Sequence, residues 1–164
     1  MGTLILAVTA LFLYSVGTAL QALHFRGKVQ SNLALTTLIG VLALIGHGLL
    51  IAQTVHLDGG FDFSFFKSSV LIAWLIVFLL LGLNLSKPVG SLFLGVYPLA
   101  AATIVMALIT HTPSRLVPDE SYGMLSHIAL SITAYSLFTL AAIPAALLYF
   151  HGRQLKQNYN RLVV

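Results

Sequence analysis

The chain has 164 residues, of which 59% are hydrophobic and 7% are charged, and its mean hydropathy is +0.99. A soluble domain carries roughly 25% charged residues, so this composition excludes an ordinary water-soluble fold and indicates a chain that lies mostly in lipid. The absence of cysteine excludes disulfides, thiolate metal sites and thiol redox chemistry.

Five apolar segments follow one another along the chain. They span about 3–24, 33–55, 68–86, 91–110 and 124–150. Crossing the hydrocarbon core takes about 20 apolar residues as helix, and backbone groups in lipid have to find hydrogen bonds within the segment. The runs do not alternate with a period of two, which excludes a β-barrel. We therefore predict an all-α, polytopic membrane bundle of five transmembrane helices that forms a single domain over residues 1–164.

The first segment is expected to remain in the protein as a membrane helix. A signal peptide would begin with a positively charged region, which this chain lacks. The apolar run from Thr3 to about Leu23 is also long enough to span the membrane.

The charged residues of the loops predict how the bundle is oriented. One set of loops and the C-terminal tail hold six basic residues and no acid: Arg26, Lys28, Lys87, Arg153, Lys156 and Arg161. The other loops hold every acid of the chain, together with two basic residues: Asp58, Asp62, Asp119, Glu120, Lys67 and Arg115. Because basic residues stay on the cytoplasmic side, we predict the N-terminus outside and the C-terminus in the cytoplasm. The net charge of +4 is thereby explained without a nucleic-acid partner.

Small and helix-breaking residues interrupt several segments. Gly40, Gly46 and Gly48 would let the second helix approach a neighbouring backbone closely, or a flat ligand. Ordinary helix packing is the favoured interpretation of these glycines. Pro98 and Pro144 should bend the fourth and fifth helices.

Four of the six histidines lie at expected helix ends. His24 and His151 fall at the cytoplasmic ends, and His56 and His111 at the outer ends. We interpret these four as interfacial residues with their polar edges in water.

His47 is different because it lies inside the second apolar segment. It is about eight residues from the outer end, or on the order of 12 Å at 1.5 Å per residue. An ionisable side chain at that depth needs a partner and by default indicates function. The alternative is a structural hydrogen bond to Gln53, to a hydroxyl on a neighbouring helix, or to a backbone carbonyl.

His127, in "GMLSHIALSITAY", lies about one turn inside the fifth segment. Ser131 and Ala134 follow at i+4 and i+7, so this face is narrow and leaves room for a planar ligand. A lone histidine on such a face is more often a packing residue than a ligand. Two neutral imidazoles from different helices could nevertheless hold a haem iron from both sides.

The apolar segments contain no carboxylate, so a proton relay or ion-coupled transport has little support. No catalytic or nucleotide-binding motif is present either, and we expect a protein that is not an enzyme.

Four stretches together resemble the cytochrome c assembly (CcsA-like) family. They are "GHGLLIAQ", "FDFSFFKSSVLIAW" (61–74), "VYPLAAATIVM" and "GMLSHIALSITAYSLFTLAAIPAALL" (123–148). The order of these stretches also matches, and the likeness extends over nearly the whole chain. It is greatest to the shorter inner-membrane branch of the family, the YpjD/HemX-like proteins.

The resemblance implies a multi-pass protein of the inner (plasma) membrane that handles non-covalently bound haem for cytochrome c maturation or a related task. His127 matches the histidine with which the family binds haem iron near the outer face. His47 matches a histidine often found in the second helix of the shorter branch. The resemblance implies no catalytic residue.

The chain departs from the family pattern after the fifth helix. Better-studied members carry there a tryptophan-rich outward loop and a second outward histidine, whereas this chain has one tryptophan, Trp74. We expect an N-terminal portion of a longer protein, a truncated or split gene product, or a minimal relative. Its partners would be a membrane chain that supplies further helices, or cytochrome c maturation components. The competing hypothesis is a structural subunit of a multi-chain complex, in which the histidines only pack.

Overall fold

Five long helices make up most of the chain in the computed structural model. They are α1 (Gly2–Phe25), α2 (Leu33–Thr54), α3 (Phe65–Ser86), α4 (Phe93–Ile109) and α5 (Tyr122–Leu162), and the short 3-10 helix η1 (Gly90–Leu92) precedes α4. Each long helix contains a stretch of sufficient length and hydropathy to cross a membrane, in α4 together with η1. The predicted all-α membrane bundle of five helices is confirmed for the described part of the chain.

The structure describes residues 2–28, 33–58, 60–87, 89–110, 113–118 and 121–162. Within these ranges it leaves out the side chains of residues 33, 147, 150, 151 and 154–162. Several residues used in the sequence analysis therefore lie outside the description, entirely or by their side chains: His111, Asp119, Glu120, His151, Lys156 and Arg161.

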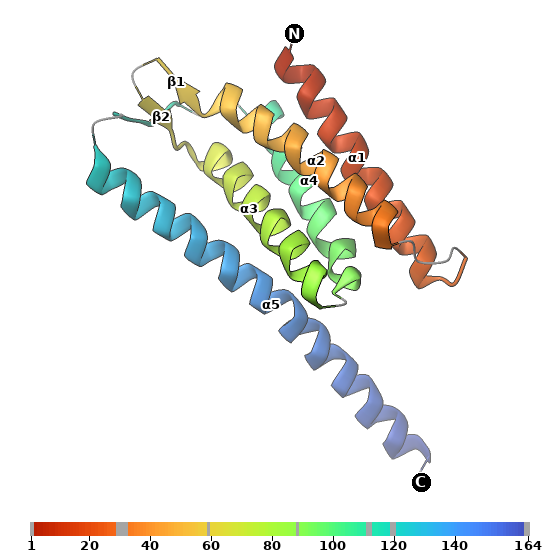
Figure 1. Ribbon diagram of the computed structural model, residues 1–164. Helices are drawn as coiled ribbons and strands as arrows, with labels where there is room; N and C mark the ends of the chain where they lie inside the picture. Colours follow the sequence, from red (N-terminus) through yellow and green to blue (C-terminus); the bar gives the residue numbers. More distant parts are fainter. Residues whose placement is uncertain are drawn as a thin grey trace.

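The helices pack side by side, and α5 stands at one edge of the bundle (Figure 1). Helix α1 packs against α2 and α4, α3 packs against α2 and α4, and α5 packs mainly against α3. The core lies among α1 to α4, where its largest fully buried side chains include Tyr14, Ile76, Leu80, Phe93 and Tyr97. Helix α5 contributes much less to this core, because most of its surface is exposed.

Glycines in α2 permit the closest contacts between helices. A Cβ at Gly40 would collide with the Tyr97 hydroxyl and lie 2.9 Å from the Leu81 side chain. At Gly48 the indole Nε1 of Trp74 would be 3.1 Å away, and that nitrogen donates a hydrogen bond of 3.0 Å to the carbonyl of Leu44. The expectation that these glycines serve helix packing is confirmed at both positions.

Short strands close one end of the bundle. β1 (His56–Leu57), β2 (Gly60–Asp62) and β3 (Leu116–Val117) form an antiparallel sheet in the order β1-β2-β3. Gly60 has φ +154°, and a Cβ there would collide with the carbonyl oxygen of Val117, so the pairing of β2 with β3 requires glycine. We call this the hairpin end. Helices α2 and α4 end here, and α3 and α5 begin here.

Two helix boundaries differ from the sequence-based expectation. Helix α3 begins at Phe65 rather than at 68, and α5 continues to Leu162 rather than ending near 150. The thickness of the membrane limits the length of the apolar stretch, but a helix can continue beyond that stretch into water. The polar residues after Phe150 include several good helix formers. Pro98 and Pro144 both lie inside helices, as expected.

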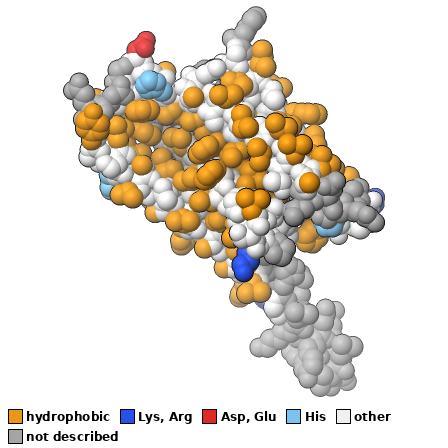
Figure 2. Space-filling view, viewed as in Figure 1, with side chains coloured by type: hydrophobic (Ala, Val, Ile, Leu, Met, Phe, Trp, Pro, Cys, Tyr) orange, Lys and Arg blue, Asp and Glu red, His pale blue; other side chains and the backbone are white. Residues whose placement is uncertain are grey.

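Figure 2 shows hydrophobic side chains across the middle of the visible face and coloured charged side chains near its ends. Large apolar residues such as Phe12, Leu38 and Phe138 are more than half exposed. A water-soluble monomer rarely exposes so much contiguous apolar surface, whereas the lipid-facing side of a membrane bundle requires it.

Candidate functional site

His47 lies in the centre of the bundle and is fully buried. Its Nδ1 is 3.0 Å from the Tyr14 hydroxyl of α1, and the two rings meet edge to face with centroids 5.8 Å apart. A hydroxyl on a neighbouring helix was one of the partners expected for this histidine. The contact joins α1 to α2 by a hydrogen bond in a region where lipid or water offers no replacement.

The other ring nitrogen of His47, Nε2, has no hydrogen bond of normal geometry in the described structure. Its polar neighbour is the backbone of Val70 in α3. A free imidazole nitrogen is a chemically suitable iron ligand. However, His47 lines none of the described cavities, and tightly packed side chains surround it. Haem therefore does not fit beside His47 in this arrangement of the helices.

His127 lies near the start of α5 and is exposed. Nine positions later Ser136 is buried against α3: its hydroxyl donates to the Ile132 carbonyl at 2.7 Å and lies 3.3 Å from the carbonyl of Ile72. Nine residues correspond to about two and a half turns, so His127 lies on the side of α5 opposite to the contact with α3. This face is open in the described structure. The Ser131 hydroxyl donates a hydrogen bond of 2.8 Å to the backbone carbonyl of His127.

The structure does not bring the two candidate histidines together. His47 points into the bundle of α1 to α4, whereas His127 is on the outward face of α5. A haem held between these two imidazoles is therefore not formed by the described chain. No group of three or more histidine, aspartate or glutamate side chains gathers into a metal site within the described ranges.

The remaining described histidines lie at the ends of helices. His24 is exposed in the last turn of α1, and His56 is exposed in β1, directly after α2. These positions agree with the interfacial interpretation. The His56 ring also lies against Phe61 of β2, with centroids 5.0 Å apart.

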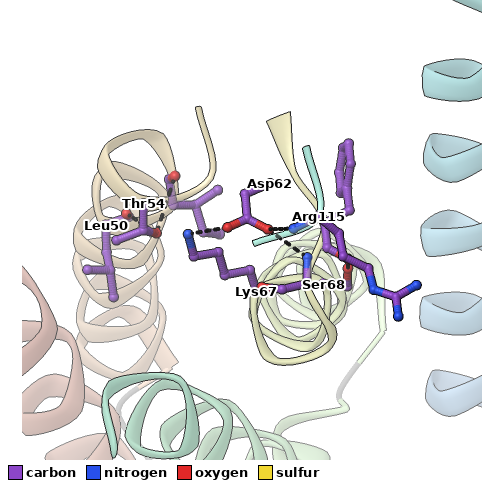
Figure 3. A network of polar contacts seen from close by, with 9 residues as sticks. Leu50, Thr54, Asp62, Lys67, Ser68 and Arg115 are labelled. Atoms are coloured by element: carbon purple, nitrogen blue, oxygen red, sulfur yellow. Dashed lines mark hydrogen bonds and ion pairs between the residues drawn. The ribbon is translucent and has the colours of Figure 1, made fainter. Parts of the chain in front are cut away.

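Asp62 organises the hairpin end (Figure 3). Its carboxylate accepts hydrogen bonds from the backbone N–H groups of Ser64 and Arg115 at 2.9 and 3.0 Å, and from the Lys67 ammonium at 2.8 Å. Figure 3 shows the Arg115 guanidinium pointing away from Asp62, so that residue contributes its backbone. We call Asp62, Lys67 and these two backbone N–H groups the Asp62 latch.

The latch fixes the charge state of Asp62. Burial by itself would raise the pKa of this carboxyl, but the hydrogen bonds from Lys67, Arg115, Ser64 and Ser114 outweigh it. The pKa therefore lies well below its ordinary value, and the group is a carboxylate at neutral pH. The ion pair joins the hairpin to α3, and the Arg115 amide joins it to the segment before α5.

The two residues that organise these polar contacts, Tyr14 and Asp62, do not stand out as site residues in the sequence. Tyr14 was not singled out, although a hydroxyl in the middle of an apolar segment is a signal that a partner is needed. Asp62 was used only as a topology charge. Its signal was weak, because an aspartate in a loop normally faces water.

Comparisons with known proteins support the membrane assignment. The chain is 29% identical over 158 residues to the inner membrane protein YpjD of Escherichia coli K12, and the alignment covers 94% of this chain. The proteins of the same name from two further Escherichia coli strains match to the same extent. The chain spans 59% of the length of these curated relatives. No protein-family model and no solved structure matches it.

Proposed function

We propose that this chain is a multi-pass protein of the inner membrane that handles haem, for cytochrome c maturation or a related haem-linked process. Three observations support the location: five membrane-length helices, the apolar surface, and the likeness to a bacterial inner membrane protein. The haem role rests on the exposed imidazole of His127 and on the resemblance of the surrounding stretch to the cytochrome c assembly family.

The position of His127 is the observation that carries the proposal. An imidazole on the exposed side of a membrane helix has few hydrogen-bond partners, so it is by default a candidate binding residue. A haem has a large apolar ring and an iron that accepts a neutral imidazole nitrogen. His127 would therefore supply an imidazole ligand to the iron, at a place that the rest of the described chain leaves open.

Each part of the chain has a distinct role in this proposal. His127 holds the iron, and the small residue Ala134 at i+7 leaves space along the same face of α5. His47 keeps α1 and α2 together through Tyr14 and is not a ligand of the same haem. A second ligand to the iron would come from a partner chain. Bound haem would supply redox-active iron, and the proposal gives no catalytic role to the described side chains.

The test is the absorption spectrum of the protein purified from haem-replete cells, followed by titration with haemin. We expect a Soret band, and we expect His127→Ala to lose it or to weaken haemin binding at least tenfold. His24→Ala is the matched control, because it removes an exposed histidine at the other end of the bundle. The proposal is wrong if the wild type stays colourless throughout the titration, or if His127→Ala binds haemin as the wild type does.

A second function, a structural subunit of a membrane complex, is favoured by the environment of His47. That histidine is hydrogen-bonded to Tyr14 and packed on all sides, as expected of a residue that only holds helices together. A protein that binds no haemin, alone or with co-expressed membrane partners, would leave this second function as the better one.

A further inference from the structure

A cavity of about 360 Å³ lies at the hairpin end between α5 and the rest of the bundle. Its walls come from the last turns of α2, from β1 and β2, and from the first halves of α3 and α5. The cavity is partly open to the surroundings. Its size lies within the range of small-molecule sites, which is roughly 300–1,000 Å³. His127 does not line it, so the cavity is separate from the haem position proposed above.

The alternation of side chains along β2 builds one wall of this cavity. Successive residues of a strand point to opposite faces, so Phe61 and Phe63 share a side and Asp62 points the other way. Phe61 and Phe63 line the cavity, whereas Asp62 is buried in its latch. The Asp62 latch therefore holds the Phe61 and Phe63 rings in place in the cavity wall. With His56 they form a row of three rings, with successive centroids 5.0 and 6.1 Å apart.

The lining decides which molecules fit. It is almost entirely hydrocarbon, with side chains such as Val55, Leu75, Ile128 and Ile132. A water molecule needs two to four polar partners, so water is a poor occupant. The Thr133 hydroxyl is already bonded to the Ala129 carbonyl at 2.8 Å. His56 is the lining side chain that has a polar group to offer, since its ring forms no hydrogen bond within the described residues.

The same lining disfavours haem in this cavity. A haem carries two carboxylates, which need basic or polar partners when they leave water. Among the described residues that line the cavity, none is lysine or arginine. A small flat ring with one or two neutral hydrogen-bond acceptors and a hydrocarbon tail fits the aromatic row, the imidazole and the apolar walls together.

We propose that this cavity binds a prenylated quinone. Its head ring lies on Phe61 and Phe63, the His56 ring donates a hydrogen bond to a quinone carbonyl, and the isoprenoid tail lies along the apolar walls and leaves through the opening of the cavity. The apolar helix α2 ends at Thr54, at the hairpin end, and His56 follows two residues later. We therefore expect His56 at the level of the membrane interface. The tail then extends from there toward the lipid-filled centre of the bilayer.

The single tryptophan of the chain gives a direct measurement. Trp74 is next to the cavity-lining Leu75 in α3, and quinones quench indole fluorescence at short range. The purified protein in detergent is titrated with decylubiquinone, and a saturable loss of Trp74 fluorescence is expected.

Ala129→Phe fills the cavity and should raise the dissociation constant at least tenfold. Ala141→Phe is the matched control, because Ala141 is exposed on α5 and lines none of the described cavities; it should bind decylubiquinone like the wild type.

The role of His56 is tested with two further variants. His56→Ala removes one neutral hydrogen bond and should raise the dissociation constant about three- to tenfold. His56→Gln keeps an N–H donor and should stay within about twofold of the wild type. Equal affinities for the wild type and both His56 variants would overturn the hydrogen bond to the quinone.

Three outcomes would overturn the quinone site as a whole. The first is quenching that does not saturate, or that is the same in Ala129→Phe, since it would show only partition into the micelle. The second is displacement of decylubiquinone by equimolar phosphatidylcholine, which would make the site one for acyl chains. The third is displacement of decylubiquinone from the wild type by haemin, if haemin no longer binds there in Ala129→Phe, since the cavity would then be a haem site. Because His127 lies elsewhere, loss of the Soret band in His127→Ala has no bearing on these outcomes.

Discussion

A tyrosine hydroxyl and an imidazole meet inside the apolar centre of the bundle, where an unpaired polar group is expensive. Tyr14 and His47 are 33 positions apart and come from different helices, and both are fully buried. Each satisfies one polar atom of the other, while the aromatic contact of Tyr14 with Tyr97 extends the cluster to α4. The pair therefore helps to specify which faces of α1 and α2 meet in a largely apolar core.

We predict that Tyr14→Phe destabilises the protein by about 0.6–2 kcal/mol, because His47 Nδ1 loses its partner in a buried site. His47→Leu should also destabilise, and the double variant should cost less than the sum of the two single variants. The measurement is a double-mutant cycle of reversible unfolding in detergent. Tyr135→Phe, at a 63% exposed tyrosine, is the control and should have no effect. Strict additivity in the cycle would contradict a direct interaction.

At the scale of elements, the three short strands join two connecting segments that are far apart in the chain. Asp62 and Arg115 are 53 positions apart, and the bond between them ties the α2–α3 connection to the segment before α5. The Phe63 N–H adds a hydrogen bond of 3.0 Å to the Arg115 carbonyl. Since α5 otherwise packs mainly on α3, this end of the molecule determines where α5 begins.

We predict that Asp62→Ala opens the hairpin end and speeds tryptic cleavage after Arg115 by about tenfold or more. The reason is that hydrogen bonds to a charged group contribute about 1.5–3 kcal/mol, and cleavage follows the population of the open form. Cleavage is followed by mass spectrometry in proteoliposomes or detergent. Asp58→Ala, at an exposed aspartate of the same connection, is the matched control. Equal cleavage rates for both variants would show that the latch does not hold the segment.

The pH dependence of the latch follows from the lowered pKa of Asp62. A carboxyl with a depressed pKa in the folded state stabilises the fold at every pH above its unfolded value, about 3.9. That stabilisation is lost as the pH falls below 3.9 through the still lower folded value. The tryptic site should therefore stay protected at neutral and mildly acidic pH, and the hairpin end should loosen only in stronger acid.

At the scale of the whole molecule, charged and apolar residues are separated along the bundle axis. Hydrophobic side chains cover the middle, and the loops at the two ends hold the charges (Figure 2). The hairpin end holds acids, whereas the described cations at the opposite end include Arg26, Lys28 and Lys87. This asymmetry predicts that the hairpin end and the N-terminus face the periplasm.

We predict that a membrane-impermeant maleimide, applied to intact cells with a permeabilised outer membrane, labels Ser114→Cys and does not label Ser91→Cys. Both serines are exposed, and they lie at opposite ends of the bundle. The chain contains no cysteine, so each variant has one reactive thiol. Lysed cells should label both variants. The reverse pattern in intact cells would place the hairpin end, and with it His127, on the cytoplasmic side.

Much of the fold follows from composition because lipid accepts so few structures. Apolar runs of about 20 residues have to be helices in a membrane, so the number of helices and their approximate limits could be read without tertiary information. The same reasoning selected His47, because an imidazole within an apolar run stands out. It also selected glycines that prove to be helix contacts, although it could not say which helix each one meets.

What the sequence by itself determined is therefore the set of membrane helices and the polar residues that need partners within them. Only the tertiary structure decided the partners: Tyr14 for His47, backbone amides for Asp62, and open space rather than a second histidine for His127. The physical reason is that these helices are apolar on nearly every side. Nothing in such a pattern fixes how each helix is rotated about its axis, and that rotation settles which side chains meet.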